Sequence, residues 1–230
     1  MKKFYKTVSI TEKDQGYTVL LDQRQVRTPL KTELIVPSQA MAGLIAAEWD
    51  AQGDTIDTHS MDVTKLANTA LDRVDPRRDE VIAELVTYAG TDMVCYYADY
   101  PEQLVSRQND LWQPYHDLIA SKTGQAFKTT SGIIHVAQDG AHLEKMQEIL
   151  LPFDSFKLTA MHAFTTGLGS FSMGLALVER ADDLKSVWPA ALVDELYQEE
   201  EWGEDFEAKQ RRDQLFKDMQ AAEQFLKSFV

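Results

Sequence analysis

The architecture of this chain is clearest in residues 17–36, which read Y-T-V-L-L-D-Q-R-Q-V-R-T-P-L-K-T-E-L-I-V. Apolar and β-branched residues alternate with polar ones, and the same period of two extends back to Phe4. This pattern predicts a small antiparallel meander with strands over 17–21, 26–28 and 33–36. Pro29 lacks a backbone donor, so it marks a strand end or an edge.

After the meander the pattern changes to that of helices. Pro37-Ser38 predicts the start of a helix that Gly53 ends, and after about residue 60 the apolar period becomes 3.6. Asp75-Pro76 reads as an N-cap followed by proline at the first helical position. The last two helices are expected over about Asp182–Glu201 and Glu204–Ser228.

Only residues 129–136 interrupt this helical pattern. Either a short strand or an extended segment that crosses between helices is expected there. The change of period is the best available domain boundary. We therefore predict an α+β fold, with a small β-rich N-terminal domain containing one helix over residues 1–60. A larger all-helical C-terminal domain follows over residues 61–230.

The overall charge of the chain limits which classes of partner it can bind. The chain has 230 residues, of which 44% are hydrophobic, and its formal net charge is −14. Such an acidic protein is repelled by nucleic acid and by anionic membranes, so neither is expected as a partner. No apolar run approaches the 18 residues that a membrane span needs, and no signal core or transit peptide is visible.

Residues that could hold a cofactor or a metal do not occur in a recognisable pattern. Gly167, Gly169 and Gly174 match no phosphate-binding loop and instead favour close helix packing. Ser172 lacks the glycine that a nucleophile elbow needs two residues before it. Cys95 stands alone, which excludes an internal disulfide and favours a buried, inert thiol in a reducing compartment. The five histidines are scattered, so we predict no catalytic residue, no metal and no cofactor.

The most unusual stretch is residues 192–207, L-V-D-E-L-Y-Q-E-E-E-W-G-E-D-F-E, where acids and aromatics alternate without a base. On one continuous helix, Trp188, Leu192 and Leu196 would form an apolar stripe bordered by Glu195 and Glu199. Two explanations stay open for these carboxylates. Glu195 pairs internally with an arginine, the candidates being Arg180, Arg211 and Arg212, or the acids form the rim of a recognition surface with aromatic anchors.

Several short motifs, taken in order and spacing, resemble the Atp12 family of assembly chaperones for the F1 part of ATP synthase. They are R-Q-V-R-T-P-L-K at 24–31, E-W-D-A-Q at 48–52, L-A-N-T-A-L-D-R at 66–73, T-D-M-V-C-Y at 91–96, Pro101 to Leu104, Gln108, Trp112, Pro114, Asp194-Glu195, Tyr197-Gln198 and Trp202-Gly203. The resemblance covers nearly the whole chain.

The resemblance implies a function that composition and spacing alone do not show. It implies a chaperone that binds the α subunit of F1 before the αβ hexamer forms, without hydrolysing nucleotide. It also implies a β-containing N-terminal domain, a helical C-terminal domain and an important acidic residue. This residue falls best on Glu195, with Glu199 and Glu200 as the alternatives. Together with the acidic run, the resemblance predicts a partner-binding site whose residues are Glu195, Tyr197, Gln198, Glu199, Glu200 and Trp202.

The expected setting follows from the same resemblance. The protein is expected to be a monomer in the bacterial cytoplasm, or in the mitochondrial matrix if it is a processed eukaryotic chain. Two other classes stay open. One is an enzyme with a composite metal or acid–base site between the domains, using Asp72, Asp92, His116 or Glu195. The other is a generic holdase that protects many unrelated proteins.

Overall fold

The chain forms two compact units, seen here in a computed structural model that describes residues 1–13, 16–180 and 182–229. One unit consists of Met1–Arg78, Asp154–Ala160 and Gln220–Val230, and the other of Asp79–Phe153 and Met161–Met219. The expectations for residues 14–15, 181 and 230 lie outside the described part. Compactness does not show which segments fold independently, so the domain boundary after residue 60 stays a prediction.

The first unit contains the predicted meander. Strands β1 (Val8–Lys13), β2 (Gly16–Leu21) and β3 (Arg24–Gln25) form an antiparallel sheet in that order. Val8 pairs with Leu21 and Lys13 with Gly16, which places Val19 and Leu21 in the core. Asp22, in the turn between β2 and β3, has a φ of 56° and accepts hydrogen bonds from the backbone N–H groups of Lys6 and Thr7.

The strands expected over 26–28 and 33–36 form only isolated bridges, which corrects that part of the prediction. Arg27 pairs with Glu33, and Tyr17 pairs with Val36. The tight turn at Thr28–Lys31 explains the difference, because it reverses the chain before a ladder can extend. Val36 nevertheless lies in the core, as its apolar character requires.

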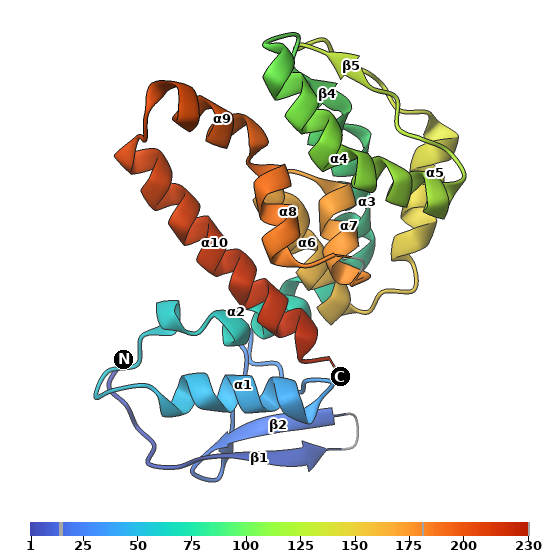
Figure 1. Ribbon diagram of the computed structural model, residues 1–230. Helices are drawn as coiled ribbons and strands as arrows, with labels where there is room; N and C mark the ends of the chain where they lie inside the picture. The colour runs from blue at the N-terminus through green and yellow to red at the C-terminus, as the bar shows by residue number, and fades with distance from the viewer. Residues whose placement is uncertain (14–15, 181, 230) are drawn as a thin grey trace. The chain divides into compact units, whose positions relative to one another are not determined.

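Helix α1 (Gln39–Asp50) lies along β1 and β2 and buries Met41 and Ile45 (Figure 1). It starts at Pro37-Ser38 as predicted, and Ser38 caps it by accepting a hydrogen bond from the N–H of Met41. Helix α2 (Asp62–Thr69) has no side-chain cap of its own. Instead the carboxylate of Glu48 on α1 accepts hydrogen bonds from the N–H groups of Val63 and Thr64 at 2.7 and 2.8 Å. A glutamate in one helix thus fixes the start of the next.

The helix start expected at Asp75-Pro76 is wrong. Asp75 has helical dihedral angles, and helical backbone continues from α2 through a π-helical turn (Ala70–Val74) and a 3₁₀ turn (Asp75–Arg77) into α3 (Arg78–Gly90). Proline cannot donate to the carbonyl four residues earlier, and the irregular turns change the hydrogen-bonding pattern at that point. A local proline signal therefore marks an irregular turn and not a helix start.

The second unit is built mostly of helices. Besides α3 they are α4 (Glu102–Thr123), α5 (Gly140–Leu150), α6 (Ser155–Leu168), α7 (Phe171–Val178), α8 (Leu184–Ala191), α9 (Val193–Trp202) and α10 (Phe206–Lys227). Helices α6 and α10 contribute residues to both units. The long helix α4 packs against α5, α7, α8 and α9 (Figure 1), and its Trp112 is buried and donates to the carbonyl of Ala190 at 2.9 Å.

The predicted fold class, a small β region followed by a mostly helical one, is confirmed. The C-terminal part is not all-helical, however. Residues Tyr96–Tyr97 (β4) and Thr130–Ser131 (β5) pair as a short parallel sheet. Strand β5 falls inside the interruption expected over 129–136.

The helix expected over Asp182–Glu201 is two helices. Asp183 caps α8, and the backbone leaves helical geometry at Leu192 (φ −112°, ψ 13°) before α9 begins. Trp188 therefore lies on α8, where its ring packs on Phe216 of α10 with centroids 4.9 Å apart. The prediction of a continuous apolar stripe through Trp188, Leu192 and Leu196 is therefore wrong.

Candidate functional site

Helix α9 contains most of the acidic stretch that the sequence singles out. Asp194 and Glu195 lie in its first turn, where negative charge interacts favourably with the helix N-terminus. Gly203 follows the helix with a φ of 91°, which a residue with a side chain rarely adopts. Asp205 then caps α10 by accepting a hydrogen bond from the N–H of Ala208. A tight connector of three residues thus joins the two helices (Figure 1).

One side of α9 is fixed to α4. Asp194 accepts a hydrogen bond of 2.7 Å from the side-chain amide of Gln108, and burial raises the pKa of this carboxyl. Tyr197 is buried and its hydroxyl donates to the side chain of Gln103. Arg107 lies over the Tyr197 ring, 5.4 Å from its centroid, and pairs with Glu200 at 2.7 Å. These contacts hold α9 in one orientation.

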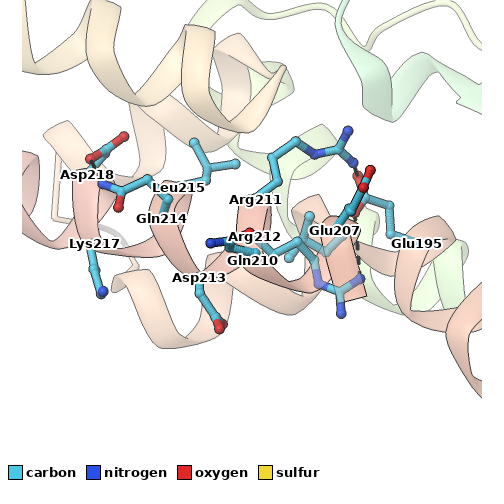
Figure 2. Close-up of a pocket in the computed structure, with 11 residues that line it drawn as sticks. Glu195, Glu207, Gln210, Arg211, Arg212, Asp213, Gln214, Leu215, Lys217 and Asp218 are labelled. Carbon is cyan, nitrogen blue, oxygen red and sulfur yellow. Dashed lines mark hydrogen bonds and ion pairs between the residues drawn. The ribbon is translucent and has the colours of Figure 1, made fainter. Parts of the chain in front are cut away.

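The other side of α9 faces α10 through ion pairs. The side chain of Arg212 is only 13% exposed and contacts Glu199, with its second nitrogen 3.8 Å from Glu195 Oε2. The side chain of Arg211 is 72% exposed and lies 3.5 Å from Glu195 Oε1. Figure 2 shows both guanidinium groups converging on the Glu195 carboxylate. Internal pairing of Glu195, one of the two explanations left open by the sequence, is therefore what the structure shows.

These ion pairs stand between two open hollows that share Glu195, Arg211 and Arg212. The larger hollow, of about 830 Å³, is drawn in Figure 2. Its other lining residues are Leu192, Glu207, Gln210, Asp213, Gln214, Leu215, Lys217 and Asp218. The second, of about 470 Å³, is also lined by Gln198, Glu199, Trp202, Gly203, Asp205 and Ala208. We call the two hollows together the α9–α10 groove.

The structure brings the six predicted partner-binding residues onto one helix but separates their roles. Gln198, Glu200 and Trp202 are exposed, Trp202 by 79%. Tyr197 is buried and supports α9, while Glu195 and Glu199 are partly covered by the arginines.

Sequence reasoning missed Arg107 and Gln103 on α4, which fix α9, and the exposed Phe206 beyond the connector. No local signal indicates the α4 contacts, because almost a hundred residues separate the partners. Phe206 belongs to the acidic stretch itself, so its aromatic character was a signal that could have been used.

The four candidates for a composite enzyme site each have a structural partner. Asp72 accepts hydrogen bonds from Thr28 Oγ1 and the N–H of Leu30, at 2.7 and 2.9 Å. Asp92 is fully buried and accepts from the N–H groups of Ser172 and Val94, at 2.8 and 3.2 Å. Burial raises the pKa of the Asp92 carboxyl.

His116, the third candidate, has Nε2 3.0 Å from the carbonyl of Val94 and 3.1 Å from the Tyr97 hydroxyl. A proton on Nε2 therefore donates to Val94, and burial lowers the pKa of the ring. Glu195, the fourth, takes part in the ion pairs with α10. Cys95 is buried as expected, and burial raises the pKa of its thiol.

Over residues 1–13, 16–180 and 182–229, no group of three or more His, Cys, Asp or Glu side chains is arranged to hold a metal. Within the same described residues, none of the helices combines the length and the hydropathy that crossing a membrane would require.

Comparison with known proteins identifies the family and the fold. A family model described as "ATP12 chaperone protein" matches residues 2–120. The crystal structure of Atp12 from Paracoccus denitrificans is 37% identical in sequence, covers 100% of this chain and 98% of its own, and superimposes with a TM-score of 0.94. The structure of an aspartate-to-lysine variant of the Paracoccus protein is 36% identical in sequence and superimposes with a TM-score of 0.95, with the same coverage of both chains.

A protein from Agrobacterium tumefaciens is 35% identical, with a TM-score of 0.93, over 100% of this chain and 86% of that one. The fold is thus that of a class of chaperones. The chain is a member of the ATP12 chaperone family.

Proposed function

We propose that this protein is an assembly chaperone for ATP synthase that binds the unassembled F1 α subunit and shields its subunit interface until the αβ hexamer forms. The observation that supports this most is the match to Atp12 over the full length of the chain. The proposal includes that the protein acts as a monomer, catalyses no reaction and works in the bacterial cytoplasm, or in the mitochondrial matrix if the chain is a processed one.

The physical need for such a chaperone is clear. A subunit outside its ring exposes surface that its neighbours later bury, and such a surface promotes aggregation. A temporary cover must protect the subunit and still yield to the next one. A polar interface selected by charge suits this better than a large apolar one, because its affinity is moderate and its association is fast.

We place the contact for the α subunit on α9, at the six predicted residues. Trp202 supplies exposed apolar area, while Gln198 and Glu200 supply exposed polar groups. Glu195 and Glu199 contribute charge at the groove, and Tyr197 holds the helix against α4. An aromatic anchor with a charged surround is a common composition for the energetic centre of a protein interface.

The test is capture of the α and β subunits, each expressed alone with the tagged protein. We expect capture of α and not of β. Glu195→Gln should reduce capture several-fold, because it removes one charge while it keeps the shape of the side chain. Glutamine is preferable to lysine, since a third cation beside Arg211 and Arg212 would disturb the fold itself.

The matched control is Glu144→Gln, an exposed glutamate on α5. It should leave capture unchanged, and circular dichroism should show both variants folded. Capture of α that survives Glu195→Gln would keep the function and move the site. Equal protection of an unrelated unfolded protein would favour the holdase. No capture of either subunit would contradict the proposal.

A further inference from the structure

Arg211 is the more exposed of the two arginines that contact Glu195 in the α9–α10 groove. Its side chain is 72% exposed and reaches Glu195 Oε1 at 3.5 Å, the outer limit of a hydrogen bond. An exposed ion pair of this geometry contributes little to stability, because water screens it and a long side chain loses freedom. Arg212, by contrast, is held with only 13% of its side chain exposed.

The two arginines leave one oxygen of Glu195 without a hydrogen bond, since Arg212 approaches Oε2 only to 3.8 Å. Among the described residues none donates a hydrogen bond to Glu195 Oε2, although this oxygen is buried. A carboxylate oxygen removed from water without a donor costs free energy, so the site would gain from a better placed cation. Glu195 lines both hollows, so a side chain that enters either one would lie beside this residue.

The rest of the groove favours the same kind of occupant. Three acids, Glu207, Asp213 and Asp218, line the larger hollow against one further cation, Lys217, and Glu199 and Asp205 line the smaller one. Leu215 supplies apolar area in the first and Trp202 in the second, while Leu192 is largely buried. A ligand with a cationic group beside an apolar side chain would match both features.

We propose that Arg211 occupies the place of a partner's cation, and that the α9–α10 groove binds a client segment whose arginine or lysine displaces Arg211 from Glu195 while a neighbouring apolar side chain packs on Trp202. This inference deepens the proposed function and rests on it for the identity of the client. A second copy of this chain is disfavoured as the occupant, because each copy has a net charge of −14.

Replacing an arginine that contacts a client directly weakens binding, whereas replacing Arg211 should strengthen it. Arg211→Gln removes the competing cation and should tighten binding of the α subunit about threefold to fivefold, the scale of an exposed ion pair. The matched control is Arg24→Gln, an exposed arginine on β3 that loses the same charge elsewhere. It should bind like the wild type, which separates the local effect from the change in net charge.

A second arm uses a defined probe in place of the client. The probe is a short synthetic peptide of arginine, leucine and serine, and its partner has glutamine in place of each arginine. Binding is followed by the emission of the exposed Trp202, with Trp202→Phe to identify its signal. We expect the arginine peptide to bind Arg211→Gln more tightly than the wild type or Arg24→Gln, and the glutamine peptide to show no such difference.

The two arms separate the two proposals. If the wild type fails to capture α while the peptides behave as expected, the proposed function fails and the groove assignment stands. If α is captured but Arg211→Gln matches Arg24→Gln in both arms, the inference is overturned and the function stands. Weaker binding by Arg211→Gln would show that Arg211 itself contacts the client, and self-association of that variant would assign the groove to a second copy. Either result would overturn the inference.

Discussion

At the scale of single residues, the acids within the family-like motifs act mostly as caps and cross-links. Glu48 caps α2, Asp72 holds the turn at Thr28 and Leu30, and Asp92 joins the start of α7 to the segment before β4. Each accepts two or more donors that would otherwise lose their partners on folding. These contacts give each of the three acids a structural role.

His116 gives a prediction for the dependence of stability on pH. Burial lowers the pKa of its ring in the folded state, while the unfolded value is about 6.5. A lowered folded pKa means that the unfolded chain binds the proton more tightly, so stability is full above about pH 6.5 and falls as pH drops towards the folded pKa. His116→Gln should make the free energy of unfolding depend less on pH below about pH 6.5.

The measurement is denaturant unfolding at a series of pH values. His59→Gln, at an exposed position, is the control and should retain the wild-type slope. A His116→Gln variant that loses stability on acidification as steeply as the wild type would show that other groups dominate, His142 among them, since burial lowers its pKa as well.

At the scale of elements, close approach between helices depends on glycine. A Cβ built on Gly174 of α7 would lie 2.7 Å from Thr165 Oγ1 and 3.2 Å from the backbone nitrogen of Thr165 on α6. Thr165 is fully buried and Gly174 is buried as well. The prediction that the glycines of this region serve helix packing is thereby confirmed for Gly174.

Gly174→Ala should therefore destabilise the protein by about 1–3 kcal/mol, the usual cost of overpacking a core. Gly43→Ala on α1 is the matched control, because a Cβ there meets nothing within 4 Å. Replacing that helical glycine by alanine should be neutral or stabilising by up to about 1 kcal/mol. Thermal unfolding of both variants checks the pair, and equal midpoints would refute the packing explanation.

At the scale of the whole molecule, the net charge of −14 sets the conditions for binding. If a cationic client is selected by charge, raising the salt concentration from about 0.05 to about 0.3 M shortens the Debye length and should weaken capture of the α subunit several-fold. Titration of capture against sodium chloride measures this slope.

The combined variant Glu195→Gln, Glu199→Gln, Glu200→Gln should show a shallower slope with salt, because fewer charges remain to be screened. Glu144→Gln should behave like the wild type. Capture that is indifferent to salt would show that apolar contacts such as those of Trp202 supply the affinity, and the electrostatic part of the proposed interface would be wrong.

The sequence by itself determined the fold class, the position of the meander and the helix start at Pro37-Ser38, because these depend on hydropathy period and on neighbours within a few residues. It also identified the acidic stretch as unusual. Local patterns failed where the chain departs from regular geometry, at Asp75-Pro76 and at Leu192.

The tertiary structure decided what the acids do. Whether Glu195 faces a partner or an arginine depends on how α10 folds back on α9, and the orientation of α9 depends on Gln108 and Arg107, far away in the chain. Such contacts carry no periodic signal, because they are made by side chains that meet only after the helices pack. The groove, and the weakly held Arg211 within it, form only when α9 and α10 pack together in the tertiary structure.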